Sequence, residues 1–368
     1  MYAFAPDYTD NTKKQVVELG AVPVDFQMNR TGVNPVKEML AIVRLAGLLK
    51  DLRVDASLGF MTKLVVYGSL AAFFAGVPRR CSMVEGLGYF FTDGDPKPSA
   101  RKAFIRHAIT LLYRMSLPLN RTVFFLNPDD RRDLAAGMSP GRYSTVILGG
   151  IGIDTREYTS APLDCDQIAF ILVARLLKEK GVREYVSAAE KVKQVYPRAS
   201  FVLVGGLDTN PGGIEETEAR EWVERGVIEW PGSVPDVKPW LSSASIYVLP
   251  SYYREGMPRS TLEAMAMGRP VITTDAPGCR ETIARYDPNE EKRRAGKDGV
   301  IEGKNGFLVP VRNVDALVAA MERFIKEPEL IPRMGAASRK LAEEKFDVRK
   351  VNAVILKAMG LESGSDEQ

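Results

Sequence analysis

The stretch 250-PSYYREGMPRSTLEAMAMG-268 predicts the fold around it, because the end of an apolar strand passes through a loop into a helix. Pro258 suits the first turn of that helix, where its missing N–H costs nothing. We expect the N–H groups of Arg259, Ser260 and Thr261 to point back into a crevice. Phosphate is favoured there by the free N–H groups and by the helix dipole.

Two carboxylates flank this expected phosphate position. Glu255 lies in the loop and Glu263 lies within the helix, so the two bracket the anion instead of meeting each other. A carboxylate accepts two hydrogen bonds from a vicinal diol. One glutamate is therefore expected to hold a sugar and the other a ribose.

The run E-G-M-P-R-S-T-L-E-A-M-A (255–266) resembles the signature of the retaining family-4, or group 1, glycosyltransferases. The resemblance implies an α/β protein of GT-B fold, with two Rossmann-like, doubly wound domains that face each other across a cleft. It also implies that Glu255 contacts the transferred sugar and Glu263 the ribose hydroxyls. The other expected donor-binding residues of this segment are Gly256, Met257, Pro258, Ser260 and Thr261.

A second motif, ARLLKEKG (174–181), directly follows an expected strand. Arg175 and Lys180 resemble the family's arginine and lysine that hold the donor diphosphate, and such cations stabilise charge on a leaving group. A purely structural role for this basic segment stays open. The runs LVGG and EWPGSVPDV resemble the loops that line the nucleotide base, which adds Gly205, Gly206, Pro231 and Gly232 to the donor-binding set.

The first half of the chain is similar to enzymes that extend lipid-linked oligosaccharides, through APDY, KLVVYGSLAAFFAGVPRR, EGLGYFFT and FFLNPDD. Glu85 stands where many relatives carry a histidine at the reaction centre. It is expected either to orient or deprotonate the acceptor hydroxyl, or to be a turn carboxylate beside Gly86. Lys63, just before a helix, is expected to meet an acceptor phosphate. The resemblance thus implies transfer from a uridine diphosphate sugar to a lipid-linked saccharide, in surface polysaccharide or glycan assembly.

Short β-branched runs alternate with amphipathic helices along the chain, which is typical of parallel sheets covered on both faces. We expect strands at 2–5, 22–26, 55–60, 81–84, 122–126, 145–148, 167–174, 200–205, 227–230, 246–250, 270–274 and 306–310. We expect helices near 11–19, 35–50, 64–75, 98–117, 128–136, 181–195, 214–225, 235–243, 259–268, 313–326, 330–345 and 347–359.

The glycine cluster at 149–152 offers the backbone freedom of a hinge. We therefore expect an acceptor-binding domain at 1–150 and a nucleotide-sugar-binding domain at 151–345. The helix at 346–359 resembles the terminal helix that packs back on the first domain. Relatives normally carry a strand and a glycine-rich turn ahead of the strand at 2–5, so we expect a truncated N-terminus.

Charge is distributed unevenly between the two expected domains. Residues 1–150 hold 19 Lys+Arg and 13 Asp+Glu, a balance of +6, which leaves 31 and 34, or −3, for the rest of the 50 and 47. The helix ARKAFIRHAITLLYRM has a basic side and an apolar side. It is expected either to lie on an anionic membrane surface or to pack on the core with its basic side in water.

Several functional classes are disfavoured. Three scattered cysteines indicate neither a disulfide framework nor a zinc site, which fits a reducing cytoplasm. The expected location is the cytoplasm, including the inner face of its membrane. The Asp-x-Asp tripeptides at 93–95 and 164–166 lie among Gly or Pro, and we interpret neither as a metal site. We expect no cofactor and no nucleic-acid partner.

Two Rossmann-like domains also occur in proteins of other function. An NAD-dependent oxidoreductase lacks support, because no expected strand leads into G-x-G-x-x-G. A nucleotide-sugar epimerase of the same fold and a non-catalytic nucleotide-sugar-binding protein stay open as alternatives.

Overall fold

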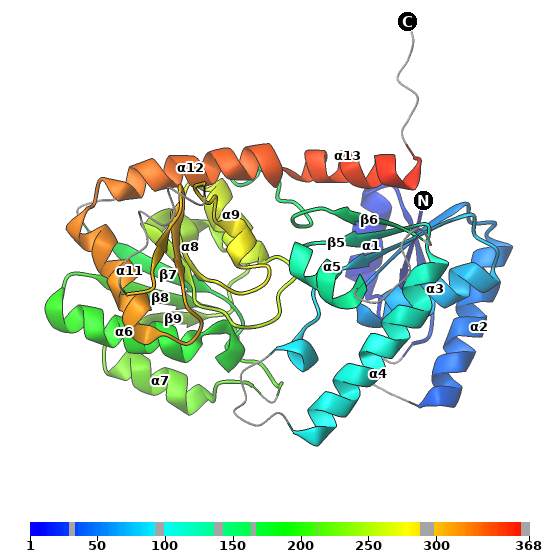
Figure 1. The fold of residues 1–368 in the computed structure, drawn as a ribbon, viewed down its shortest axis with the longest axis horizontal. Helices are drawn as coiled ribbons and strands as arrows, with labels where there is room; N and C mark the ends of the chain where they lie inside the picture. The colour runs from blue at the N-terminus through cyan, green and yellow to red at the C-terminus, as the bar shows by residue number, and fades with distance from the viewer. Residues whose placement is uncertain are drawn as a thin grey trace, which may run out of the picture.

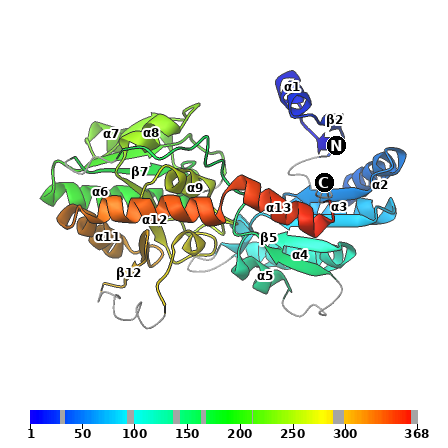
Figure 2. The same cartoon turned by 90° about the horizontal axis from the view of Figure 1, so that it is seen from above.

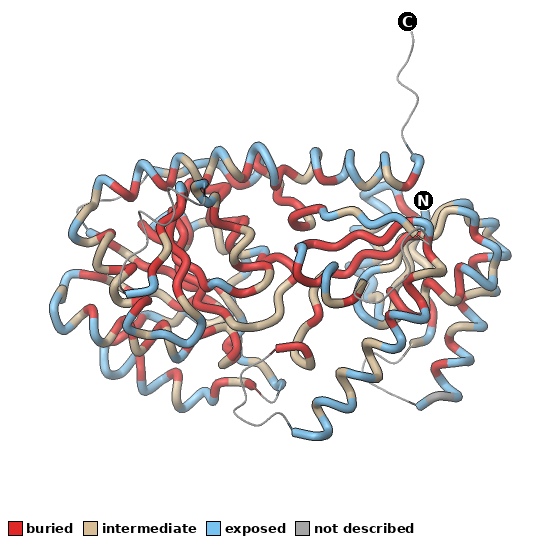
Figure 3. The backbone as a smooth tube through the Cα atoms, viewed as in Figure 1, coloured by how far each residue is buried: buried red, intermediate tan, exposed pale blue. Residues whose placement is uncertain are grey.

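The computed structural model describes residues 1–28, 34–92, 99–135, 143–162, 167–210, 212–287 and 298–361. The two Asp-x-Asp tripeptides and most of the charged segment at 284–299 lie outside these ranges. The described chain forms two α/β halves that lie side by side (Figure 1). Buried strands run through the centre of each half, and exposed residues concentrate on the outer helices (Figure 3).

The C-terminal half is built on a seven-stranded sheet with the order β12-β13-β11-β10-β7-β8-β9. All neighbours are parallel except β12 and β13. Its strands are β7 (Ala169–Val173), β8 (Ser200–Val204), β9 (Glu229–Gly232), β10 (Ile246–Leu249), β11 (Val271–Thr274), β12 (Ile301–Glu302) and β13 (Gly306–Val309). Its helices are α6 (Val182–Val195), α7 (Glu216–Glu224), α8 (Lys238–Ser243), α9 (Arg259–Ala266), α11 (Val314–Lys326) and α12 (Leu330–Lys345). Strands β10, β11 and β13 are buried along their whole length, which explains why none of them carries a charged residue.

The N-terminal half contains a four-stranded parallel sheet with the order β3-β4-β5-β6. Its strands are β3 (Ala56–Phe60), β4 (Arg79–Val84), β5 (Thr122–Phe125) and β6 (Ser144–Ile147). Its helices are α2 (Pro35–Asp51), α3 (Thr62–Phe74), α4 (Ala100–Ser116) and α5 (Pro128–Ala135).

The first two strands form a sheet of their own. Strands β1 (Tyr2–Ala5) and β2 (Val22–Asp25) pair in parallel, and α1 (Asp10–Glu18) joins them. Figure 2 shows this unit set apart from the four-stranded sheet. It is anchored by Phe26, which packs in one core cluster with Leu45 and Leu49 of α2. Periodicity locates the strands but does not predict which of them pair.

Most expected elements are confirmed to within a few residues, and α12 matches its expected range of 330–345. The structure adds elements that the sequence reading missed: the short strand β12 and the 3₁₀ turns η1 (Tyr89–Phe91), η2 (Leu117–Leu119), η3 (Lys178–Lys180) and η4 (Arg280–Thr282). Such short elements carry too few residues for a periodic pattern.

The last helix, α13 (Val348–Met359), continues the line of α12 and lies over the N-terminal half (Figure 1). Asp347 caps its start by accepting from the Arg349 N–H at 2.9 Å. At its end, the Arg79 guanidinium donates to the Gly360 carbonyl at 2.6 Å. No helix within the described ranges combines the length and apolar character needed to cross a bilayer.

Candidate active site

Two loops of the C-terminal half are held together by one backbone carbonyl. The Glu179 carbonyl in η3 accepts hydrogen bonds from the N–H groups of Tyr252 and Tyr253, at 2.9 and 3.0 Å. The backbones of Gly181 and Pro250 also lie close together, since a Cβ added at Gly181 would lie 2.2 Å from the Pro250 carbonyl oxygen. The segment after β7 therefore packs directly on residues 252–256, which we call the glutamate loop.

This packing brings Lys180 and Glu255 into contact. The Lys180 Nζ lies 2.5 Å from Glu255 Oε1, and the two side chains are only 15% and 11% exposed. The Ser251 hydroxyl donates to the same carboxylate oxygen at 3.2 Å. Residues expected to meet the diphosphate and the sugar are thus adjacent. An ammonium has three donors, so Lys180 can keep this bond and still reach a second anion.

Arg175 is held by a partner that the sequence reading did not identify. Its Nη1 lies 2.5 Å from Asp208 Oδ2, and the aspartate side chain is buried while the arginine is largely exposed. Asp208 also accepts from the Asn210 N–H at 2.8 Å, which fixes the carboxylate in its loop. The one sequence signal was an acidic residue two positions after the glycine pair in LVGGLD.

The start of α9 differs in detail from the expectation. Pro258 is the N-cap and Arg259 begins the helix. The Thr261 N–H already donates to the Pro258 carbonyl at 3.2 Å, and Thr261 is fully buried. The Thr261 N–H is therefore not available to a phosphate, which leaves those of Arg259 and Ser260. The Ser260 hydroxyl pairs with the buried Tyr247 phenol at 2.7 Å.

Glu263 is nine-tenths buried and bonds a different set of partners from Glu255. Its Oε1 receives the Tyr158 hydroxyl at 3.2 Å and the Arg259 Nε at 3.0 Å. Tyr158 precedes β7, and nothing in the sequence near it signals this role. Met257 is also buried, against Gly150, where a Cβ would lie 3.2 Å from Met257 Cγ.

The glycine loops after β8 and β9 lie beside the Arg175 segment. The Gly205 N–H donates to the Gly232 carbonyl at 2.9 Å, and the Gly206 carbonyl accepts from the Leu176 N–H at 2.9 Å. A Cβ at Gly205 would lie 1.8 Å from the Ala174 carbonyl oxygen, so glycine is required there. Pro231 is exposed next to this junction.

A cavity of about 500 Å³ is lined by part of the glutamate loop and by the N-terminal half. Glu255 and Gly256 line it from one side, and Lys63 and Glu85 line it from the other. Burial raises the pKa of the Glu85 carboxyl, an effect opposed by a hydrogen bond from the Met61 N–H. A half-buried carboxyl whose pKa is raised is suited to accept a proton.

The two halves touch through backbone alone at one point of this cavity. A Cβ at Gly256 would lie 2.0 Å from the Glu85 carbonyl oxygen, and a Cβ at Gly86 would lie 2.5 Å from the Gly256 nitrogen. Both backbones can approach so closely only because neither residue has a side chain. The contact sets Glu85 and Glu255, distant in sequence, at one boundary.

Lys63 is also already paired. Its Nζ lies 2.8 Å from Glu38 Oε1, and the Glu38 side chain is only 9% exposed. The sequence reading missed Glu38, which lies on α2 and only approaches Lys63 because α2 packs on α3.

Comparison with known proteins identifies the family of this chain. The model of the glycosyl transferases group 1 family matches residues 167–327. A Campylobacter jejuni protein, N,N'-diacetylbacillosaminyl-diphospho-undecaprenol alpha-1,3-N-acetylgalactosaminyltransferase, is 30% identical over 302 residues, covering 78% of this chain and 77% of the relative. The chain belongs to the group 1 glycosyltransferases.

This glycosyltransferase has further relatives of the same kind. The Escherichia coli UDP-Gal:alpha-D-GlcNAc-diphosphoundecaprenol alpha-1,3-galactosyltransferase is 22% identical, with 79% of this chain and 71% of the relative covered. Among solved structures, Anabaena Alr3699/HepE in complex with UDP superposes with a TM-score of 0.72 at 15% identity, covering 98% of this chain and 91% of that one. The expected GT-B fold is thereby confirmed.

Proposed function

We propose that this glycosyltransferase moves galactose or N-acetylgalactosamine from its uridine diphosphate ester to a saccharide linked to undecaprenyl diphosphate. The anomeric configuration is retained. The contact between Lys180 and Glu255, close before the start of α9, carries this proposal. It joins a cation suited to bind a diphosphate with a carboxylate suited to bind a sugar. The proposed donor domain is 151–345 and the proposed acceptor domain is 1–150.

The relatives support the substrate class. The names of the C. jejuni and E. coli enzymes both specify a diphospho-undecaprenol acceptor and an alpha-1,3 linkage. They differ in the transferred sugar, N-acetylgalactosamine in one and galactose in the other. An α-linked product from an α-linked nucleotide sugar requires retention.

The donor half supplies binding and leaving-group stabilisation. Arg175 and Lys180 bind the diphosphate, and the N–H groups at the start of α9 face the same anion. As the bond from sugar C1 to the phosphate oxygen breaks, negative charge grows on the diphosphate, and these fixed donors stabilise it. Glu255 binds sugar hydroxyls, and Glu263 binds the ribose.

The acceptor enters from the N-terminal half. Glu85 takes the proton of the acceptor hydroxyl. The acceptor oxygen bonds to sugar C1 on the same face from which the diphosphate leaves. Lys63 and the start of α3 bind the acceptor diphosphate, since the N-cap residue Met61 makes no side-chain cap hydrogen bond.

An enzyme that acts on a lipid-linked acceptor needs a surface that faces the membrane. Helix α2 exposes Val36, Met39, Leu40 and Val43, whose spacing of three and four residues forms one stripe. Helix α4 likewise exposes Phe104, Leu111 and Met115, flanked by exposed Arg101 and Arg114. An apolar stripe with basic neighbours suits the inner face of an anionic membrane.

The donor assignment is tested by Glu255→Gln and Arg175→Ala in the full chain. Both should lower transfer from the nucleotide sugar roughly 100-fold or more, because each removes a group that acts on the reacting sugar or its leaving diphosphate. Arg183→Ala, which breaks the exposed Arg183 to Glu218 pair, is the control. Unchanged rates would refute the assignment, and turnover of labelled donor without acceptor, into a free nucleotide-sugar epimer, would favour the epimerase alternative.

The role of Glu85 is tested by the pH dependence of kcat/KM. The base must be ionised, and burial raises its pKa above the ordinary glutamate value, so activity should fall as the pH drops through that raised pKa. The fall should begin at higher pH than an ordinary glutamate of about 4.3 would give. Glu85→Gln should remove most activity and flatten this acidic limb, and an unchanged limb would exclude Glu85 as its source.

The membrane surface is tested by co-sedimentation with vesicles. Wild-type protein should bind phosphatidylglycerol vesicles more than neutral phosphatidylcholine vesicles, and the double change Met39→Ser and Leu40→Ser should lower that binding. Val195→Ser, at an equally exposed position in the C-terminal half, should not. Equal binding by all three proteins would argue against this surface.

A further inference from the structure

The glutamate loop is bonded to the C-terminal half at Tyr252 and Tyr253, but from Arg254 onward it is also held by the N-terminal half. Arg254, the neighbour of Glu255, bonds that half through backbone and side chain alike. Its N–H donates to the Thr92 hydroxyl at 2.9 Å, and its carbonyl accepts from the Gly88 N–H at 3.1 Å. Its Nε and Nη2 lie 2.9 and 2.5 Å from Asp130 and Asp133.

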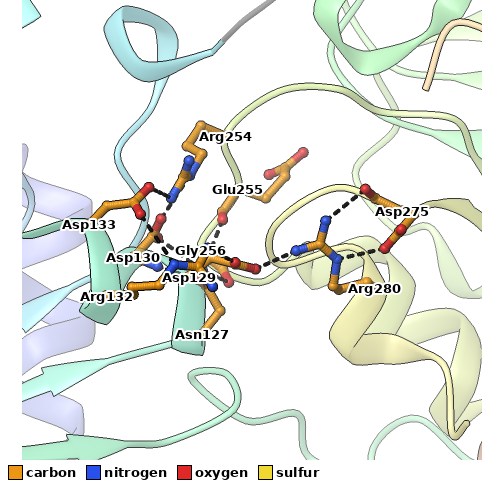
Figure 4. A network of polar contacts seen from close by, with 10 residues as sticks. All are labelled: Asn127, Asp129, Asp130, Arg132, Asp133, Arg254, Glu255, Gly256, Asp275 and Arg280. Carbon is orange, nitrogen blue, oxygen red and sulfur yellow. Dashed lines mark hydrogen bonds and ion pairs between the residues drawn. The ribbon is translucent and has the colours of Figure 1, made fainter. Parts of the chain in front are cut away.

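The Arg254 to Asp130 pair is buried at the boundary between the halves. The Asp130 side chain is fully buried and that of Arg254 is 10% exposed. Figure 4 shows the guanidinium reaching from the glutamate loop to the carboxylates at the start of α5. Removing one partner of such a pair leaves a charge without compensation, so the two groups are strongly coupled.

Asn127 adds a second grip on the same loop. Its Nδ2 donates to the carbonyls of Glu255 and Gly256, at 3.2 and 2.9 Å. Its Oδ1 meanwhile accepts from the Asp130 N–H at 2.8 Å and so caps α5. The Asn127 side chain thus links the backbone at Glu255 to α5, the helix that carries Asp130, the partner of Arg254 (Figure 4).

We infer that Asn127, Asp130 and Arg254 are positioning residues for sugar transfer, through which the N-terminal half sets the place of Glu255. The inference rests on the proposed role of Glu255. Nucleotide binding should depend much less on these contacts, because Arg175 and Glu263 bond partners outside the glutamate loop, and Lys180, although it bonds Glu255, is carried by η3 of the C-terminal half. A displacement of about 1 Å at a reacting group costs up to roughly 100-fold in rate. The loss should therefore appear in kcat and leave the affinity for the nucleotide intact.

The sequence of α5 fits this role. Asn127-Pro-Asp-Asp is a helix start in which Asn caps, Pro takes the first position, and Asp favours the dipole. The same carboxylates meet guanidinium groups of the other half: Asp130 meets Arg254, and Asp129 meets Arg280 Nη1 at 2.6 Å. One local feature serves both helix initiation and contact between the halves.

Arg280 offers a matched control in the same interface. It crosses from the C-terminal half to Asp129, and its Nε bonds Asp275 at 2.6 Å. Its described bonds go to these aspartates and not to the glutamate loop (Figure 4). Arg280→Ala therefore weakens the contact between the halves without releasing Glu255.

The experiment compares Asn127→Asp, Arg254→Lys, Arg280→Ala and Glu255→Gln in the full chain. Asn127→Asp keeps the cap but replaces the donor with a carboxylate that faces two carbonyls, and Arg254→Lys keeps the charge but loses the two-pronged geometry. Each protein is measured for kcat, for KM of the nucleotide sugar, for UDP affinity by calorimetry, and for melting temperature. We expect the first two variants to lose roughly 10- to 100-fold in kcat while UDP affinity stays within about threefold.

Three results would overturn the inference. Wild-type kcat in Asn127→Asp and Arg254→Lys, with Glu255→Gln inactive, would reject the positioning role and leave the site assignment standing. A loss in Arg280→Ala as large as in the other two would show that general docking of the halves is responsible. Full activity in Glu255→Gln would reject the proposed role of Glu255 and the positioning role with it.

Discussion

The backbone contact between Glu85 and Gly256 is the constraint on which the candidate active site depends. A Cβ added at Gly256 would lie only 2.0 Å from the Glu85 carbonyl oxygen, so at this point the two halves meet with no side chain between them. This closeness lets carboxylates from two separate sheets line one cavity. It also explains why the loop beside Glu255 can bond the N-terminal half through Arg254 and Asn127.

Paired charges dominate the proposed donor site. Lys180 lies against Glu255, Arg175 against Asp208, and Arg259 against Glu263. Each cation is held in place before any ligand arrives, which lowers the entropy cost of binding an anion. The same pairs offset the negative charge of the carboxylates, which would otherwise repel an anionic diphosphate. The proposed chemistry thus relies on fixed donors, as electrostatic stabilisation of a leaving group requires.

The sequence predicted the elements and the family well, because buried strands and amphipathic helices leave periodic patterns and the run from Glu255 to Ala266 is continuous. It did not predict the pairing of β1 with β2 alone, since periodicity carries no information about strand partners. It also missed Asp208, Tyr158, Asn127 and Asp130. Each of these acts across a contact between distant segments, and local sequence marks them only as ordinary turn or cap residues.

A structure of the full chain with an intact uridine diphosphate sugar tests the central claim most directly. The account predicts the diphosphate within hydrogen-bonding distance of Arg175 and Lys180 at the start of α9, the ribose on Glu263, and the sugar on Glu255 facing the cavity that Glu85 lines. A nucleotide bound in another place, or a sugar turned away from Glu255 and out of this cavity, would contradict it.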